Sequence, residues 1–222
     1  MNPVQALLDL LYPCKCPFCG RVLERGEEGA CAVCLEQLPW AEKGKAVEGC
    51  EACLSPLRYQ DKVRDGVHRY KFQGGQIHAK LFGGLMARCL TQRWEGPVDC
   101  ITWAPLHRKR RRERGYDQAE LLARRVGELT GIPVLPALEK VRATGEQSRL
   151  TDEAERRANA AGAYRILPGV ELAGKRVVLV DDVVTTGATM EQCAACLRGA
   201  GAASVVGLTL AQAGVTFSRE KK

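Results

Sequence analysis

The chain of 222 residues is long enough for one sizeable core and a small additional module, because single domains usually span about 100 to 200 residues. Hydrophobic residues make up 45% of it and charged residues 27%, a balance typical of globular proteins that argues against a disordered chain. The formal net charge of +7 favours a polyanionic partner, either a nucleic acid or a multiply phosphorylated small molecule.

The chain begins with a short amphipathic pattern. Apolar side chains at helical spacing between Pro3 and Leu11 predict a short helix that packs on the rest of the protein. This stretch is far shorter than the roughly 20 residues that a membrane-spanning helix needs, and no basic region precedes it. We therefore expect a cytoplasmic protein with no membrane insertion.

Eleven cysteines, an odd number, are concentrated near the start, where seven precede residue 54. Their paired spacing favours a metal site or free thiols over disulfides. The pairs Cys16/Cys19 and Cys31/Cys34 are separated by eleven residues, which is typical of tetrahedral zinc bound by four thiolates. We expect structural Zn²⁺ at these four, contributing about 10 kcal/mol to the folding of a segment with little core of its own.

A third pair, Cys50 and Cys53, has no partner pair. Two interpretations stay open for it: the pair replaces one of the zinc-binding pairs, or it binds no metal.

The rest of the chain predicts an α/β fold. Helices are expected around Val63–Tyr70 and Ile77–Cys89. Beyond Pro97 the expected order is strand Asp99–Ala104, loop Pro105–Arg114, a helix opened by a capping box at Asp117 and Glu120, a second box at Asp152 and Glu155, strand Arg176–Val180, helix Ala188–Arg198 and strand Ser204–Leu210. Strands that alternate with helices indicate a parallel, helix-covered sheet over residues 56–222, with the zinc module over residues 1–55.

The segment Val177–Thr189 carries the clearest chemical signal. Its apolar strand delivers Asp181 and Asp182 to the carboxyl edge of the sheet, where open α/β sheets bind ligands. The following turn opens a helix, and its N–H groups and hydroxyls suit a phosphate. The residues predicted to bind that phosphate are Val184, Thr185, Thr186, Gly187, Ala188 and Thr189.

The two acids would repel a phosphate that they faced, so we expect them to hold the vicinal hydroxyls of a ribose or a hydrated magnesium ion. The pattern therefore predicts a ribose 5-phosphate site. Neither the Walker loop nor the dinucleotide fingerprint fits these residues. An ordinary strand-to-helix connection with an acidic cap is the alternative.

The stretch Val177–Thr189 resembles the phosphoribosyl diphosphate motif of type I phosphoribosyltransferases. Together with Arg114–Gln118, the dipeptide Lys71-Phe72 and the N-terminal Cys pairs, it makes the whole chain resemble the ComF family, whose members are linked to natural competence and DNA uptake. The chain departs from the family pattern in having Asp117 where Asn is usual, and three Cys-x-x-Cys pairs in its N-terminal part where some relatives have four.

The resemblance implies a type I phosphoribosyltransferase fold in which Asp181 and Asp182 are the catalytic pair that holds the ribose hydroxyls. It also implies that Mg²⁺ accompanies phosphoribosyl diphosphate and that pyrophosphate is displaced at the anomeric carbon through an oxocarbenium-like state. The loop expected to meet the pyrophosphate consists of Pro105, Leu106, His107, Arg108 and Lys109.

A run of basic residues follows that loop. Its members Arg110, Arg111, Arg112 and Arg114 are candidates for contact with a nucleic-acid backbone, with a solvated surface as the alternative. Tyr116 is the nearest aromatic residue for base stacking. The segment Arg142–Arg157 is expected to form a hood over the ligand.

Three functions therefore stay open. The first is a phosphoribosyltransferase that acts on an acceptor the sequence does not reveal. The second is a single-stranded-DNA-binding factor of DNA uptake that retains a nucleotide pocket without turnover. The third is a docking factor whose zinc module binds a helicase or channel component of the uptake machinery.

Overall fold

The computed structural model describes residues 13–73, 75–142 and 162–214. The helix predicted between Pro3 and Leu11 and the second capping box, at Asp152 and Glu155, lie outside these ranges, as does the expected hood apart from Arg142. Within the three ranges, we find no helix that combines the length and the apolar character needed to cross a bilayer.

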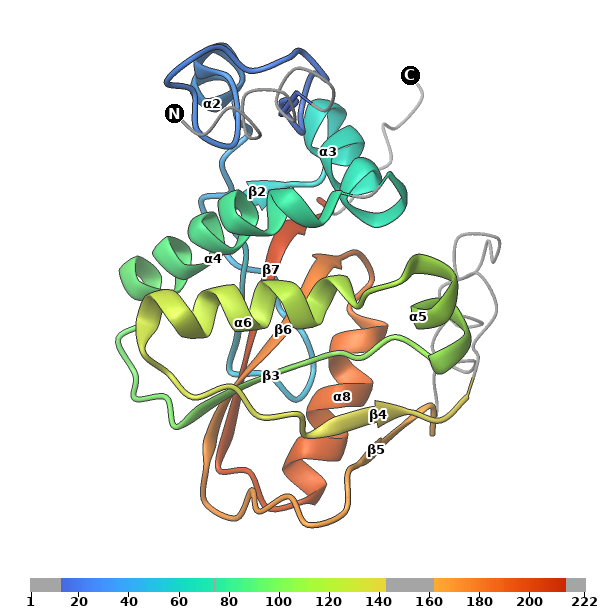
Figure 1. The fold of residues 1–222 in the computed structure, drawn as a ribbon. Helices are drawn as coiled ribbons and strands as arrows, with labels where there is room; N and C mark the ends of the chain where they lie inside the picture. Colours follow the sequence, from blue (N-terminus) through green and yellow to red (C-terminus); the bar gives the residue numbers. More distant parts are fainter. Residues whose placement is uncertain (1–12, 74, 143–161, 215–222) are drawn as a thin grey trace, which may run out of the picture.

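A five-stranded parallel sheet forms the centre of the molecule (Figure 1). Its longest strands are β6 (Arg176–Val184) and β7 (Ser204–Gln212), which pair with each other along their whole length. Strand β3 (Cys100–Trp103) pairs with the other side of β6, while β1 (Ala52–Leu54) and β2 (Leu57–Arg58) both pair with β7. The strands around the predicted site are therefore parallel, as expected.

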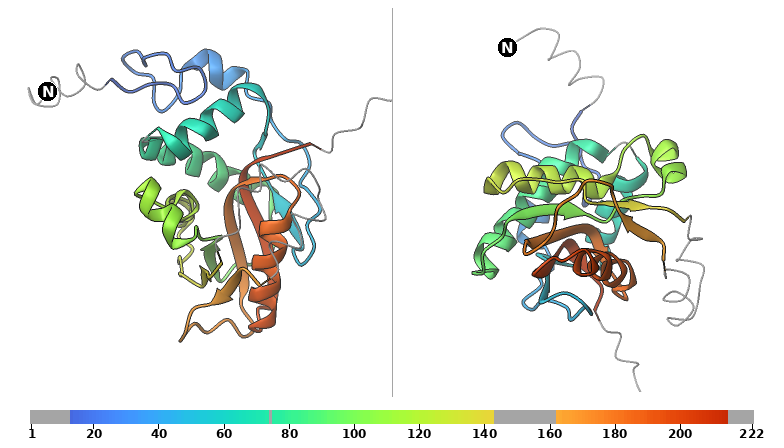
Figure 2. Two further views of the ribbon diagram at one scale, coloured as in Figure 1. Left: turned by 90° about the vertical axis from the view of Figure 1, so that its right-hand side faces the viewer. Right: turned by 90° about the horizontal axis from the view of Figure 1, so that it is seen from below.

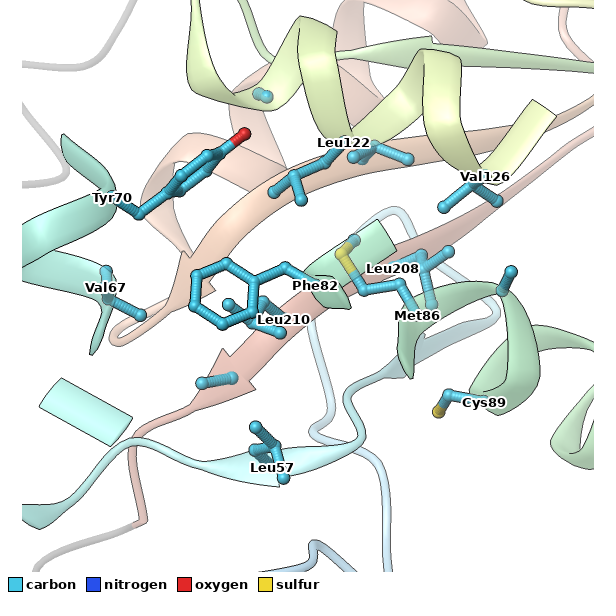
Figure 3. Packing of buried hydrophobic residues seen from close by; sticks show 14 of the residues in the cluster. Leu57, Val67, Tyr70, Phe82, Met86, Cys89, Leu122, Val126, Leu208 and Leu210 are labelled. Atoms are coloured by element: carbon cyan, nitrogen blue, oxygen red, sulfur yellow. The ribbon is translucent and has the colours of Figure 1, made fainter. Parts of the chain in front are cut away.

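Helices cover both faces of this sheet (Figures 1 and 2). Helices α3 (Asp61–Phe72), α4 (Ala79–Arg93) and α6 (Gln118–Thr130) belong to one face, and α8 (Ala188–Gly199) packs on the other. Figure 3 shows the first core, where side chains from all three helices meet the apolar face of β7. The continuous apolar run before Asp181 is buried because helices lie against both of its sides.

Several smaller elements complete the fold. Helix α2 (Ala32–Glu36) lies among the N-terminal cysteines, and the 3₁₀ turn η1 (Gly75–His78) leads into α4. Strands β4 (Leu138–Lys140) and β5 (Tyr164–Ile166) form a separate antiparallel pair beside α8. The central sheet already begins at Ala52, within the range expected for the zinc module, so the division at residue 55 stays a prediction.

The start of α6 confirms the half of the first capping box that Asp117 supplies, whereas the Glu120 carboxylate pairs with Arg111 and Arg124. The Asp117 side chain accepts hydrogen bonds from the N–H groups of Ala119, at 3.1 Å, and Glu120, at 3.3 Å. The helix ends at Gly131, whose φ of 74° is the left-handed conformation that glycine adopts without strain.

The prediction of a loop from Pro105 to Arg114 was wrong in its second half, where α5 (Arg108–Arg114) forms. Arginine, lysine and glutamate are strong helix formers, so a run of these residues favours a helix even without an apolar face. Nδ1 of His107 accepts from the N–H of Lys109 at the start of the helix, and Gly115 ends it with a φ of 79°.

Candidate functional site

The carboxyl edge of the sheet is hollowed into a cavity of about 390 Å³. It lies where β6 and β3 end, which is the place predicted for the ligand. Its lining includes both predicted acids, three threonines of the following turn and four cationic side chains. These residues are Asp181, Asp182, Thr185, Thr186, Thr189, Lys71, Arg110, Arg114 and Lys140.

The two acids at the end of β6 differ in their environments. The Asp182 carboxylate belongs to a residue that is 4% exposed, and it forms an ion pair with Nζ of Lys71 at 2.7 Å. The Asp181 carboxylate accepts a hydrogen bond from the N–H of Asp182 at 2.7 Å. Burial in the cavity wall, together with the neighbouring charge of Asp182, raises the pKa of Asp181 to about 8 although Lys71 opposes the shift. Near neutral pH, the Asp181 carboxyl is therefore largely protonated.

The turn after β6 has the geometry of an anion site. Gly187 immediately precedes α8 with a φ of 99°, and a side chain there would approach Val47 and Glu191. The lack of a Cβ at Gly187 leaves room for these two side chains beside the turn, and the helix dipole adds positive potential at the start of α8. The side chain of Thr186 accepts a hydrogen bond from the N–H of Ala188 at 3.4 Å.

A lysine that the sequence pattern did not reveal holds this turn from outside. Nζ of Lys45 donates to the backbone carbonyl of Thr185 and, at 3.5 Å, to that of Ala213. Lys45 lies between the cysteine-rich segment and β1, with no motif around it, so only the fold brings it to the turn.

The loop expected to meet pyrophosphate reaches the cavity only in part. Pro105 and Leu106 line the cavity, whereas His107 caps α5 and the side chains of Arg108 and Lys109 are exposed. Arg108 instead lies 3.9 Å from the carboxylate of Glu139.

Helix α5 divides the basic run between the cavity and the surface. Arg110 and Arg114, which the sequence suggested for nucleic acid, line the cavity. Arg111 and Arg112 are exposed outside it, and Arg111 pairs with Glu120 at 3.1 Å. The helical period explains the division, because positions four apart point to the same side.

Two further cavity residues come from the small antiparallel pair. Nζ of Lys140 lies 5.0 Å from the ring centroid of Tyr164, and both residues line the cavity. Burial lowers the pKa of Lys140 and raises that of Tyr164. Neither residue could be recognised in the sequence, because strands of three residues carry too little periodicity.

Asp117, the departure from the family pattern, is a structural residue in this fold. Besides capping α6, its carboxylate accepts the N–H of Leu106 at 2.7 Å and so fixes the cavity loop to the helix. Burial raises the pKa of Asp117, while the backbone N–H groups that it accepts act in the opposite direction. An asparagine oxygen could accept some of the same hydrogen bonds, which explains why either residue suits this position.

Tyr116 does not offer the stacking surface that we expected from the sequence. It is only 8% exposed, and its hydroxyl donates to the backbone carbonyl of Tyr70. Phe72 is the exposed aromatic residue nearby: 58% of it is exposed, and the Arg114 guanidinium lies 4.6 Å from the centre of its ring.

The four cysteines predicted to bind zinc come together in the structure. The sulfur atoms of Cys16, Cys19, Cys31 and Cys34 all lie within 4.8 Å of one another, which fits one tetrahedral ion. Burial acts to raise the pKa of Cys31, but hydrogen bonds from the Cys34 backbone and from the other three thiols outweigh it and lower this pKa to about 7. The Cys31 thiol therefore ionises readily near neutral pH, and the chemistry and spacing of the set suit Zn²⁺.

The remaining pair, Cys50 and Cys53, lies elsewhere. Cys53 belongs to β1 and is fully buried in the core on the α8 side, and Cys50 packs against the same core. The structure therefore favours the interpretation in which this pair is not part of the zinc site.

Comparison with known proteins agrees with this geometry. A model of the phosphoribosyl transferase domain matches residues 114–220. The DNA utilization protein YhgH of Salmonella typhi is 32% identical over 86% of this chain and 80% of its own length. Competence protein F of Haemophilus influenzae is 30% identical over 89% and 84%, and competence protein ComFC of Streptococcus pneumoniae is 29% identical over 86% and 84%.

The parallel sheet, the acid pair before the hydroxyl-rich turn and these relatives lead to one assignment. The chain belongs to the ComF family and combines a type I phosphoribosyltransferase fold with an N-terminal four-cysteine cluster that could hold zinc.

Proposed function

We propose that the cavity binds phosphoribosyl diphosphate, or a nucleotide through its ribose 5-phosphate, and that the protein is a phosphoribosyltransferase linked to competence. The observation that carries the proposal is the composition of one cavity: an acid pair, a hydroxyl-rich anion turn and four cations line the same space of about 390 Å³. A ligand with a diol between two phosphorylated ends matches all three features.

The charges support a polyanion rather than a neutral sugar. Four cations face two acids, of which Asp181 is largely protonated near neutral pH, so the cavity has an excess of positive charge. This potential attracts phosphoryl groups and increases their rate of binding. The acids are needed for the part of the ligand that donates hydrogen bonds, the ribose hydroxyls.

In the proposed complex, the turn from Val184 to Thr189 binds the 5-phosphate while Asp181 and Asp182 accept hydrogen bonds from the ribose hydroxyls. Arg110 and Arg114 are assigned to the pyrophosphate side together with Pro105 and Leu106. As the bond from the anomeric carbon to pyrophosphate breaks, positive charge develops on the ring and negative charge on the leaving group. The acids stabilise the first and the arginines the second, so the protein needs no nucleophile.

Magnesium fits this site because it prefers oxygen ligands and binds through one or two carboxylates together with substrate phosphates. The carboxylate of Asp181 is the candidate ligand, since the carboxylate of Asp182 already pairs with Lys71. Bound Mg²⁺ would neutralise charge on the departing pyrophosphate.

Calorimetric titration of phosphoribosyl diphosphate in the presence of Mg²⁺ tests the proposal. Wild type should bind it, and the Asp181→Asn/Asp182→Asn double variant, which keeps the shape of both side chains, should bind at least about tenfold more weakly. The control is Glu95→Gln/Glu171→Gln, which replaces two carboxyl groups by amides at exposed positions outside the cavity lining. Equal affinity of wild type and the aspartate variant would refute the proposal.

A second function has its own observation in its favour. Helix α5 carries the exposed cations Arg111 and Arg112, and its last residue, Arg114, lies over the exposed ring of Phe72. The related proteins are named for competence and DNA utilization. We propose that this surface of α5 binds the backbone of single-stranded DNA and that the uptake machinery is the setting in which it acts.

The salt dependence of single-stranded DNA binding tests this second function. Arg111→Gln/Arg112→Gln should weaken binding uniformly across DNA sequences. The slope of the logarithm of the binding constant against the logarithm of the salt concentration should fall in magnitude by about 1 for each phosphate that is no longer neutralised. Arg88→Gln/Arg198→Gln, at exposed positions outside both α5 and the cavity lining, is the matched control. Binding that does not depend on salt, or an equal reduction in the control, would contradict the proposal.

A further inference from the structure

The four-cysteine cluster and the ligand cavity are joined by a single helix, α3. The sequence suggested a cysteine-rich module with little core of its own. The structure instead shows that Cys16, Phe18 and Cys34 belong to the same buried cluster as side chains of α3, α4 and α6. Figure 1 shows α3 lying between the cysteine-rich segment and the sheet.

The first contact between α3 and the cluster is a close approach at Gly66. A Cβ at this position would lie 3.2 Å from Cδ1 of Phe18 and 3.3 Å from the carbonyl oxygen of Pro17. Both belong to the turn between Cys16 and Cys19, so this metal-binding turn rests directly on the helix. The Phe18 ring then continues into the core, where its centroid lies 5.9 Å from that of Phe82.

The second contact is made by Arg69, one turn further along the helix. Its Nη1 donates to the carbonyl oxygen of Pro17 at 2.6 Å and to that of Phe18 at 3.2 Å. A guanidinium that binds two carbonyls of one turn fixes both the distance and the orientation of that turn relative to the helix.

The next two residues carry the connection to the cavity. The fully buried Tyr70 donates its hydroxyl to the carbonyl of Gln118 at 2.9 Å and accepts the hydroxyl of Tyr116 at its own carbonyl. Lys71 then places its Nζ 2.7 Å from the carboxylate of Asp182. The consecutive residues Arg69, Tyr70 and Lys71 therefore contact, in order, the metal-binding turn, the core and the acid pair. Figure 3 shows the Tyr70 ring among the buried side chains of the core.

We propose that the four-cysteine module acts as a support for the ligand cavity, with Lys71 as the positioning residue that it controls. When the four thiolates hold their metal, the turn that carries Pro17 and Phe18 is rigid and fixes α3, which keeps the Lys71 ammonium against Asp182. When the metal is removed, α3 loses this support, the ion pair loosens, and the acid pair can no longer present a fixed geometry to a diol. The effect on ligand affinity rests on the proposed function, whereas the coupling between the four-cysteine module and Lys71 does not.

Two variants weaken the support without touching the cavity or the cysteines. Arg69→Ala removes both hydrogen bonds to the turn. Gly66→Ala inserts one methyl group between helix and turn and leaves every polar contact in place; alanine is also the better helix former, so unfolding of α3 is not its expected effect. The control is Arg176→Ala, which removes two hydrogen bonds to the Asp99 carboxylate. This ion pair lies where β3 and β6 begin, at the edge of the sheet opposite to the cavity.

Two measurements are made on the zinc-loaded protein and again after the zinc has been chelated and dialysed away. The first is the reactivity of Lys71 toward an acylating reagent, followed on its peptide by mass spectrometry. The second is the affinity for phosphoribosyl diphosphate with Mg²⁺. Arg69→Ala, Gly66→Ala and zinc removal should each increase the reactivity of Lys71 and weaken binding by about fivefold or more. Lys71→Met, which has no amine to label, should weaken binding in the same direction, and Arg176→Ala should change neither quantity.

Unchanged Lys71 reactivity in both support variants and in the zinc-free protein would overturn the inference, and so would an equal effect of Arg176→Ala. If wild type binds no phosphoribosyl diphosphate but Lys71 reactivity still responds to Gly66, Arg69 and zinc, the proposed function fails and the coupling stands.

Discussion

Replacing Asp181 with asparagine should stabilise the protein while it weakens ligand binding. The pKa of this carboxyl is raised from 3.8 to about 8, so at pH 7 the folded protein must hold a proton that the unfolded chain has released. At about 1.4 kcal/mol for each pH unit, holding this proton costs about 4 kcal/mol at pH 7 as an upper bound. Asp181 is half-buried in the lining of a cavity and not enclosed in the core, so we expect about 2 kcal/mol, which a neutral amide of the same shape would avoid.

The pH dependence gives this prediction its sign. Between pH 4 and pH 8, the folded state binds more protons at Asp181 than the unfolded state does, so the wild type loses stability relative to Asp181→Asn as pH rises. The difference in the free energy of unfolding should be near zero at pH 4, grow through pH 7 and level off above pH 8.

Urea unfolding of both proteins across this pH range measures the difference, and calorimetric titration of phosphoribosyl diphosphate measures binding. The control is Asp182→Asn, which should be less stable than wild type at pH 7 because it leaves Lys71 without its partner. A difference between wild type and Asp181→Asn that does not change between pH 4 and pH 8, or a lower stability of that variant at pH 8, would refute the reasoning.

Three further predictions concern the parts that hold the site. Asp117→Ala should lower the free energy of urea unfolding by about 1 to 2 kcal/mol because it removes the cap of α6, whereas Asp117→Asn should cost clearly less. Gly187→Ala should destabilise the protein by about 1 kcal/mol or more, given its φ of 99°, and weaken phosphoribosyl diphosphate binding in calorimetry. Elemental analysis should find one zinc per chain, and its removal should lower the midpoint of thermal unfolding; Cys50→Ser should leave the zinc content unchanged.

The sequence was most informative where chemistry and secondary structure coincide. The run before Asp181 could be recognised as a buried strand, and the capping box at Asp117 marked the start of a helix, because both signals are local. The short strands β1, β2, β4 and β5 were missed, since two or three residues show no period and their pairing partners are distant in the chain. Helix α5 was missed because charged residues without an apolar stripe give no periodic signal even when their propensity is high.

The candidate site was predicted only as far as its motif extends. The acids and the phosphate turn are consecutive residues, so one segment revealed them. The cations of the cavity come from three separate elements: Lys71 from α3, Arg110 and Arg114 from α5, and Lys140 from β4. Within the basic run, composition could not say which arginines face the ligand, because this depends on the helical phase of α5 relative to the cavity.

An acid pair next to an anion-binding turn poses an electrostatic problem that this fold solves in two ways. A carboxylate and a phosphate 4 Å apart repel by about 4 kcal/mol at the effective dielectric constant near a protein surface, so two charged aspartates would oppose the binding of any phosphorylated ligand. Lys71 neutralises Asp182 directly, and the raised pKa of Asp181 keeps that carboxyl largely protonated near neutral pH. A protonated carboxyl can donate to a ligand oxygen as well as accept from a hydroxyl, and Mg²⁺ can displace its proton on binding. Ligand and metal should therefore bind together with release of a proton, and this release should be largest below pH 8.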